Sequence, residues 1–156
     1  QNLSRATFKP PIRRDVTVDG QSLPGFVLEF SDANGTDVTT FECIATKGGL
    51  VTALKLNGVN MLLEREEADK LDGSVFWPSP QSSWDWPPPT AIDPVPSGKP
   101  SAAYEAAVDE EAMSVSLTSP ADSDLGIRVA KRFSVDLDLR ALVLEYSIIN
   151  TGGEAR

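Results

Sequence analysis

Residues 38–63 read VTTFECIATKGGLVTALKLNGVNMLL, and this stretch decides the fold class. Its first nine residues are rich in β-branched and aromatic side chains, which favour strands. A Lys-Gly-Gly turn at 47–49 leads to LVTALKL (50–56), whose alternating residues suit the two faces of a sheet. Asn57-Gly58 is the strongest short hairpin signal, and the chain then returns through VNMLL. The stretch therefore predicts a three-stranded antiparallel meander.

The flanking sequence predicts more strands and no convincing helix. FVLEF (26–30) is a short apolar strand followed by a turn signal at 32–35, and residues 1–25 read as an extended lead-in with room for a strand at 15–18. The last third predicts a second meander, with strands at 102–108, 112–119, 126–135 and 141–150. About eight or nine short strands at this spacing are typical of an all-β, antiparallel β-sandwich. We expect residues 1–156 to form a single sandwich domain or the N-terminal portion of a larger one.

The composition excludes several classes of function. The chain has 23 acidic and 14 basic residues, a net charge of -9, whereas nucleic acids and anionic membranes require a cationic footprint. We therefore expect no nucleic-acid partner and no membrane partner. There is no histidine, the commonest general acid/base and metal ligand, and no cofactor is predicted. The single cysteine, Cys43, lies in an apolar strand pattern and is expected to be a buried structural thiol.

The stretch FWPSPQSSWDWPPP (76–89) contains all three tryptophans of the chain and five of its twelve prolines. Proline excludes a helix and a central strand, so we expect a long functional loop over 76–100. Tryptophan faces beside polar side chains suit a carbohydrate ligand, which presents CH patches with hydroxyls at the rim. The alternative is that the tryptophans cap one end of the sandwich. The candidate ligand-binding residues of the loop are Trp77, Gln81, Trp84, Asp85 and Trp86.

Lys131 and Arg132 are two further candidates for ligand binding. Lys131 shares the inward parity of the apolar residues in the strand 126–135, where a lysine needs a partner or a cavity. Its alternative is to extend to the sheet edge. Arg132, on the opposite face, could pair with Asp136, with Glu145 or with a ligand oxygen, and a surface ion pair is the simpler expectation.

Two acidic clusters could offer oxygen ligands to a hard cation. They are Asp122-Ser-Asp124 and Glu64-Arg-Glu66-Glu67, and the spacing of neither matches a complete calcium motif. We predict no metal site, and we interpret the charged run 64–73 as a solvated loop or a single helical turn.

Three segments together resemble the aldose 1-epimerase (galactose mutarotase)-like superfamily. GGLVTALKLNGVNMLL (48–63) is similar to a glycine-rich signature near the start of these proteins. FWPSPQSSWDWPPP resembles a loop of a bacterial branch. VSLTSPADSDLGIRVAKRFSVD (115–136), followed by LVLEYSIINTG (142–152), is similar to a hairpin and strand of the superfamily.

The resemblance implies a carbohydrate-active β-supersandwich that binds a sugar in a groove across one sheet. Mutarotases use histidines as the acid and a glutamate as the base. This chain has no histidine and no glutamate that matches that base, so its catalytic residues are unknown. More strands follow the equivalent of Arg156 in the family. The chain is therefore expected to be an N-terminal portion with open sheet edges, which would self-associate or pair with a missing C-terminal portion.

Three functions follow from these patterns. The first is carbohydrate binding by a sandwich that is not catalytic alone. The second is that the chain forms one wall of an aldose epimerase or another carbohydrate-active enzyme. The third is a structural or protein-interaction sandwich. The chain begins with Gln1, which is expected if a signal peptide has been removed, so we predict a periplasmic or secreted location.

Overall fold

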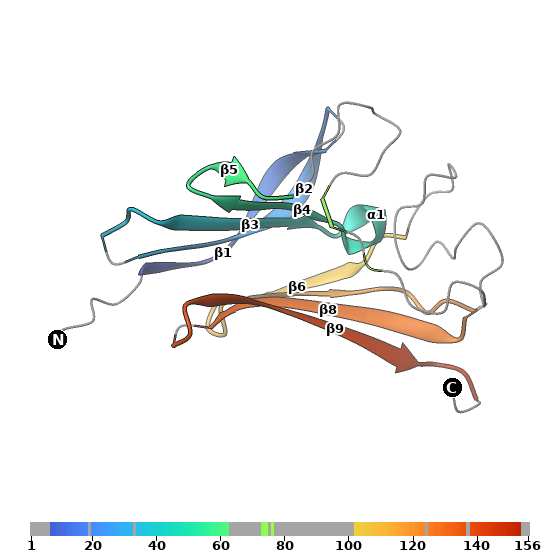
Figure 1. Ribbon diagram of the computed structural model, residues 1–156. Coiled ribbons are helices and arrows are strands. Elements are labelled where there is room, and N and C mark those ends of the chain that lie inside the picture. Colours follow the sequence, from blue (N-terminus) through green and yellow to red (C-terminus); the bar gives the residue numbers. More distant parts are fainter. Residues whose placement is uncertain are drawn as a thin grey trace.

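A computed structural model describes residues 7–18, 20–32, 34–62, 73–74, 76, 102–123, 125–136 and 138–153. The described residues form two antiparallel sheets that pack face to face, as Figure 1 shows. The predicted all-β, antiparallel sandwich is therefore confirmed.

The first sheet is a five-stranded meander in which each strand pairs with its neighbour in sequence. Its strands are β1 (Thr7–Val18), β2 (Gln21–Ser31), β3 (Val38–Ile44), β4 (Val51–Leu56) and β5 (Val59–Asn60). The three-stranded meander predicted from residues 38–63 corresponds to β3, β4 and β5. The predicted Asn57-Gly58 turn joins β4 to β5, and both residues have positive φ, as a tight hairpin requires.

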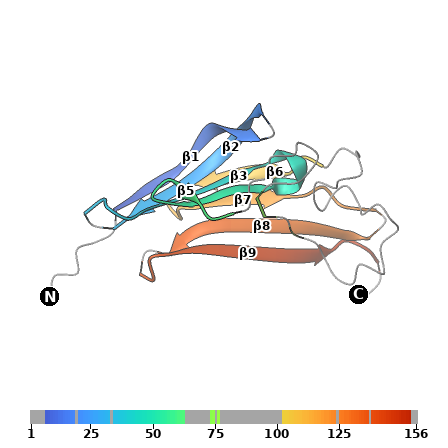
Figure 2. The ribbon, with the colours of Figure 1, turned by 45° about the horizontal axis from the view of Figure 1, so that its top comes forward.

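The second sheet is a four-stranded meander with the order β6-β7-β8-β9. Its strands are β6 (Glu105–Asp109), β7 (Ser114–Thr118), β8 (Ile127–Asp136) and β9 (Ala141–Asn150). These are the four strands predicted for the last third of the chain. Figure 2 shows β9 at one border of the molecule, with β8 beside it.

The core lies between the two sheets and follows the period of two expected for strands. Phe26 and Leu28 of β2 and Phe41 of β3 face inward, where they meet Val129 and Phe133 of β8. The Phe41 and Phe133 rings, one from each sheet, have centroids 4.8 Å apart. We call the faces that meet here the inner faces and the opposite ones the outer faces.

The strand β1 is longer than the sequence predicts. It runs from Thr7, whereas the sequence indicated only a short strand at 15–18. Pro10 and Pro11 fall in a register irregularity between Lys9 and Ile12, and β1 is an edge strand, so prolines are tolerated there.

The β1–β2 hairpin curves over the outer face of the first sheet (Figure 1). There Val16 and Val18 pack with Ile44 and Leu50 in a second, smaller hydrophobic cluster. Gly25 lies where the strands approach closely, because a Cβ at this position would be 2.8 Å from Val16 Cγ2.

A tight turn, α1 (Thr46–Gly49), joins β3 to β4 where the sequence predicted a Lys-Gly-Gly turn. Lys47, Gly48 and Gly49 all have positive φ, with values of 51°, 72° and 65°. Two glycines suit this left-handed backbone. The segment that enters β6 is tied to the turn, since Gly48 N donates to Ala102 O and Tyr104 N donates to Ala45 O.

Candidate functional site

The predicted ligand-binding residues fall into two groups. Those of the tryptophan- and proline-rich loop lie outside the described residues, and for them the prediction stays a prediction: Trp77, Gln81, Trp84, Asp85 and Trp86. Lys131 and Arg132 are described. They are consecutive residues of β8, so their side chains point to opposite faces of the second sheet.

Lys131 lies on the inner face, and its side chain connects the two sheets. Only 1% of the residue is exposed, so the alternative prediction, that the side chain extends to the sheet edge, is wrong. Its Nζ donates to Gly48 O at 2.8 Å and to Gly49 O at 3.1 Å. The left-handed turn α1 places these two carbonyl groups within reach of β8. Lys131 therefore satisfies polar groups of the first sheet from a strand of the second.

Aromatic rings surround the Lys131 ammonium group. Its Nζ is 5.3 Å from the ring centroid of Tyr104 and 6.0 Å from those of Phe76 and Tyr146. A cation within about 6 Å of an aromatic face is attracted by the electron density of the ring. The rings and the two carbonyl groups together replace part of the hydration that the buried charge loses.

Phe76, the first residue of the predicted functional loop, stacks on Tyr146 of β9. The two ring centroids are 5.0 Å apart, with planes 13° from parallel. Tyr146 also meets Phe133 edge to face at 6.1 Å. A continuous row of rings thus runs from the core to the beginning of the loop.

Cys43 lies on the inner face with no exposed surface. Burial raises the pKa of its thiol to about 12, although the positive charge of Lys131 acts in the opposite direction. The thiol is therefore protonated at physiological pH and a poor nucleophile. The sequence expectation of a buried thiol is confirmed.

Arg132 lies on the outer face and forms an ion pair with Glu145 of β9. The distance from Arg132 Nη1 to Glu145 Oε2 is 2.8 Å, and about half of each side chain is exposed. Glu145 is one of the partners that the sequence offered. The pair follows directly from strand register, because Arg132 and Glu145 are opposite each other in the β8–β9 ladder.

An open depression of about 290 Å³ surrounds this ion pair on the outer face of β7, β8 and β9. Two rows of cross-strand neighbours form it. One row is Ser116, Arg132 and Glu145, and the other is Thr118, Ala130 and Ser147. Ala130 is the smallest of these side chains and lies on the central strand, which leaves the surface hollow there. Lys131 borders the depression as well, but its ammonium group is on the inner face.

The three hydroxyl residues of this depression, Ser116, Thr118 and Ser147, were missed by sequence reasoning. They come from two strands on either side of β8, and only the register of both ladders brings them together. The sequence pattern that could have predicted them is the alternation of small polar residues with apolar ones in VSLTS and EYSI, which places the polar residues on the outer face.

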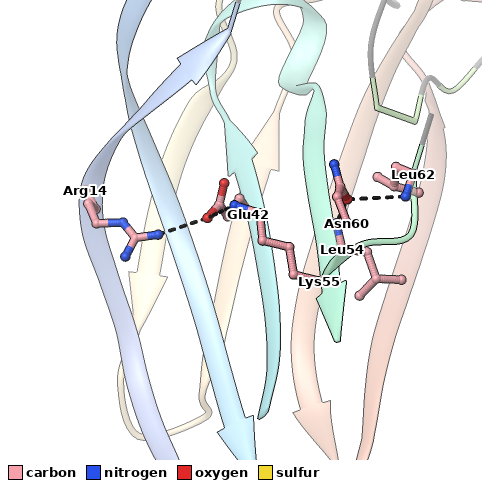
Figure 3. A network of polar contacts seen from close by, with 6 residues as sticks. All are labelled: Arg14, Glu42, Leu54, Lys55, Asn60 and Leu62. Carbon is pink, nitrogen blue, oxygen red and sulfur yellow. Dashed lines mark hydrogen bonds and ion pairs between the residues drawn. The ribbon is translucent and has the colours of Figure 1, made fainter. Parts of the chain in front are cut away.

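A second polar cluster, shown in Figure 3, lies on the outer face of the first sheet. Glu42 of β3 is only 7% exposed, and its Oε1 accepts from Arg14 Nη2 at 2.9 Å and from Lys55 Nζ at 3.0 Å. Nearby, Asn60 Oδ1 accepts from the backbone N–H groups of Leu54 and Leu62. The Glu42 cluster ties β1, β3 and β4 together and is structural in character.

The acidic clusters considered for a cation are only partly described. Glu64, Glu66, Glu67 and Asp124 lie outside the described residues. The Asp122 carboxylate accepts from the backbone N–H of Leu125 at 2.8 Å and so closes a turn. In the part of the chain that the structure describes, no three potential ligands gather in one place.

None of the helical residues described forms a segment long and apolar enough to cross a membrane. The periplasmic or secreted location stays a prediction.

Comparison with known proteins found no matching family model, no matching curated protein and no matching solved structure. The resemblance to aldose 1-epimerase-like proteins therefore stays a prediction from the three segments that carry it.

Proposed function

We propose that the chain is a carbohydrate-binding β-sandwich, with the depression around Arg132 and Glu145 as its binding surface. The observation that carries the proposal is that two rows of cross-strand neighbours lie side by side on the outer face of β7, β8 and β9. They place hydroxyl groups on both sides of an ion pair, over a floor formed by Ala130.

The chemistry of this surface matches a polyhydroxyl ligand. Each serine or threonine hydroxyl can both donate and accept a hydrogen bond, as each sugar hydroxyl can. The Arg132 guanidinium offers several donors in one plane, and the Glu145 carboxylate offers acceptors. Because an exposed ion pair contributes only about 0–1 kcal/mol, a ligand can share or replace its contacts at small cost.

The dimensions favour a small ligand or one terminal unit of a longer one. Ligand pockets usually enclose about 300–1,000 Å³, and this depression is near the lower limit at about 290 Å³. Its openness to solvent leads us to expect weak affinity, with Kd values near 1 mM, or about -4 kcal/mol. Trp77, Trp84 and Trp86 lie outside the described residues and stay separate candidates for stacking on a sugar.

Binding is better supported than catalysis. Hydrolysis of a glycoside usually needs two carboxylates, and sugar epimerisation needs an acid and a base. Among the described residues that line this depression, Glu145 is the one carboxylate, and it is paired with Arg132. The alternative, that the chain forms one wall of an aldose epimerase, would require catalytic groups from another source.

The proposal is tested by NMR titration of the full chain with a panel of monosaccharides and oligosaccharides. We expect chemical-shift changes at Ser116, Thr118 and Ser147, and an Arg132→Gln variant that binds about tenfold more weakly, because a hydrogen bond to a charged group is lost. Arg128→Gln is the matched control. Arg128 is exposed on the same face of the same strand but does not line the depression.

Equal binding by both variants and by the parent would exclude the depression as the site. If Arg132→Gln binds normally while Trp84→Ala and Trp86→Ala do not, the ligand is held by the loop instead. No shift change with any sugar would contradict carbohydrate binding itself.

A further inference from the structure

The strand β9 has a long edge that no described strand covers. It is ten residues long, and among the described strands it pairs with β8 alone. Its exposed apolar side chains are Leu144 at 42%, Tyr146 at 36%, Ile148 at 53% and Ile149 at 44%. An edge strand of this kind can add a further strand through its backbone groups.

The other sheet edges carry the features that usually prevent strand addition. The edge strand β1 has two prolines, a register irregularity and the charged residues Lys9, Arg13 and Arg14. At the other border of that sheet, β5 has only two residues. In the second sheet, β6 is a five-residue strand that begins at Glu105 and ends at Asp109. Charge, proline and short length all disfavour pairing, whereas β9 is long, has no proline and carries one charged side chain, Glu145, which is paired with Arg132.

The sequence of β9 is self-complementary when a second copy runs antiparallel to it. With a twofold axis at Tyr146, this residue faces its own equivalent, and Leu144 faces Ile148 of the second copy. On the other face of the strand, Glu145 faces Ser147 of the second copy. Apolar side chains are then opposite apolar ones, an arrangement that stabilises neighbouring strands. A twofold interface requires this kind of self-complementary surface.

Charge also favours this edge for contact between two copies. The chain carries a net charge of -9, so two copies repel each other over most approaches. Glu145 is the only residue of β9 that is charged at neutral pH, and Arg132 is paired with it. An axis at Glu145 would place two carboxylates opposite each other, whereas an axis at Tyr146 avoids this.

From these observations we infer that β9 is a homodimer interface. Two copies pair antiparallel through β9 about a twofold axis at Tyr146, and their second sheets become one continuous sheet. The inference does not rest on sugar binding, although Glu145 and Ser147 at this interface also line the outer-face depression.

Analytical ultracentrifugation of the full chain over a range of concentrations tests the inference. We expect a monomer–dimer equilibrium in the parent. Ile148→Lys should raise the dimer Kd about tenfold or more, because it buries an unpaired charge at the interface. Ile12→Lys is the matched control, since Ile12 is 49% exposed on the other long edge strand, and it should dimerise as the parent does. A parent that is monomeric at every concentration, or equal effects of the two substitutions, would overturn the inference.

Disulfide trapping tests the register without relying on the Ile148 variant. Chains with Glu145→Cys and chains with Ser147→Cys are mixed and oxidised gently. The mixed pair should cross-link much faster than either variant alone, because residue 145 faces residue 147 of the second copy. Native Cys43 has no exposed surface and stays out of the reaction. If the mixed pair cross-links no faster than the single variants, the proposed twofold pairing is wrong.

Discussion

The Nζ atom of Lys131 donates a hydrogen bond of 2.8 Å to the carbonyl oxygen of Gly48, across the interface between the two sheets. The two residues are 83 positions apart in the chain. A buried lysine thus serves as an inter-sheet connection, where an apolar side chain would be usual.

Lys131→Met should destabilise the protein although it keeps most of the apolar length of the side chain. The substitution removes hydrogen bonds to two buried carbonyl groups, so the free energy of unfolding should fall by about 2 kcal/mol. Urea denaturation measures the change. Arg128 is exposed on the same strand, and Arg128→Met should change the free energy of unfolding by less than about 0.5 kcal/mol. Equal stability of Lys131→Met and the parent would contradict a stabilising role for this contact.

Glu42→Gln should weaken the outer face of the first sheet. The neutral amide cannot replace the charge that Arg14 and Lys55 share, and we expect a loss of about 1–2 kcal/mol in the free energy of unfolding. Glu29→Gln is the control, because Glu29 pairs with Lys9 in a more exposed position. It should cost at most about 1 kcal/mol, the range of surface ion pairs. Thermal or urea unfolding of the parent, Glu42→Gln and Glu29→Gln measures these free energies of unfolding. The expectation is wrong if Glu29→Gln lowers the free energy of unfolding as much as Glu42→Gln does.

The turn after β2 should respond to acid through Asp32. The Thr36 side-chain hydrogen bond, followed by the backbone N–H of Asp37, lowers the pKa of Asp32 from its ordinary value of 3.8. A lowered folded-state pKa means that the contribution of Asp32 to stability is present above pH about 4 and is lost as the pH falls through the folded-state value. NMR titration of the carboxyl carbon measures this pKa. Thr36→Val should raise it toward 3.8, and a parent value at or above 3.8 would contradict the hydrogen-bonding explanation.

Cys43 should react with a thiol reagent at pH 8 only through unfolding. Its thiol has a pKa of about 12 and no exposed surface, whereas an unfolded cysteine has a pKa near 8.5. The reaction rate should therefore rise with urea in parallel with the unfolded fraction. A Ser147→Cys chain provides the comparison. Its thiol at the exposed position 147 should react rapidly, and its thiol at Cys43 should react slowly. Rapid reaction of the folded parent would show that Cys43 is accessible.

Local patterns predicted most strands because their signals are local. The Asn57-Gly58 turn and the alternation in β4 fixed the β4–β5 hairpin, and the alternation in β8 placed Lys131 inward and Arg132 outward. The full length of β1 escaped prediction, because Pro10 and Pro11 argue against a strand unless it lies at a sheet edge. Whether a strand is an edge depends on the whole sheet.

The contacts of the candidate site could be predicted only where the sequence predicts the register between neighbouring strands. A hairpin between β8 and β9 places Glu145 near Arg132, and the pair was among those expected. The partners of Lys131 were not, because Gly48 belongs to the other sheet and local sequence does not encode how the sheets pack. The hydroxyls of Ser116 and Thr118 depended on the β7–β8 register, which the eight-residue connection between these strands leaves open.

The meander topology has a consequence for how the chain folds. Every strand of the first sheet precedes residue 61 and every strand of the second follows residue 104, so no described backbone ladder spans the gap between them. Each sheet can grow from its own hairpins, which close over short loops and form within microseconds. The remaining slow event is the docking of two preformed layers. Lys131 and Gly48 meet only at that step, and substitutions at this contact should therefore accelerate unfolding more than they retard folding.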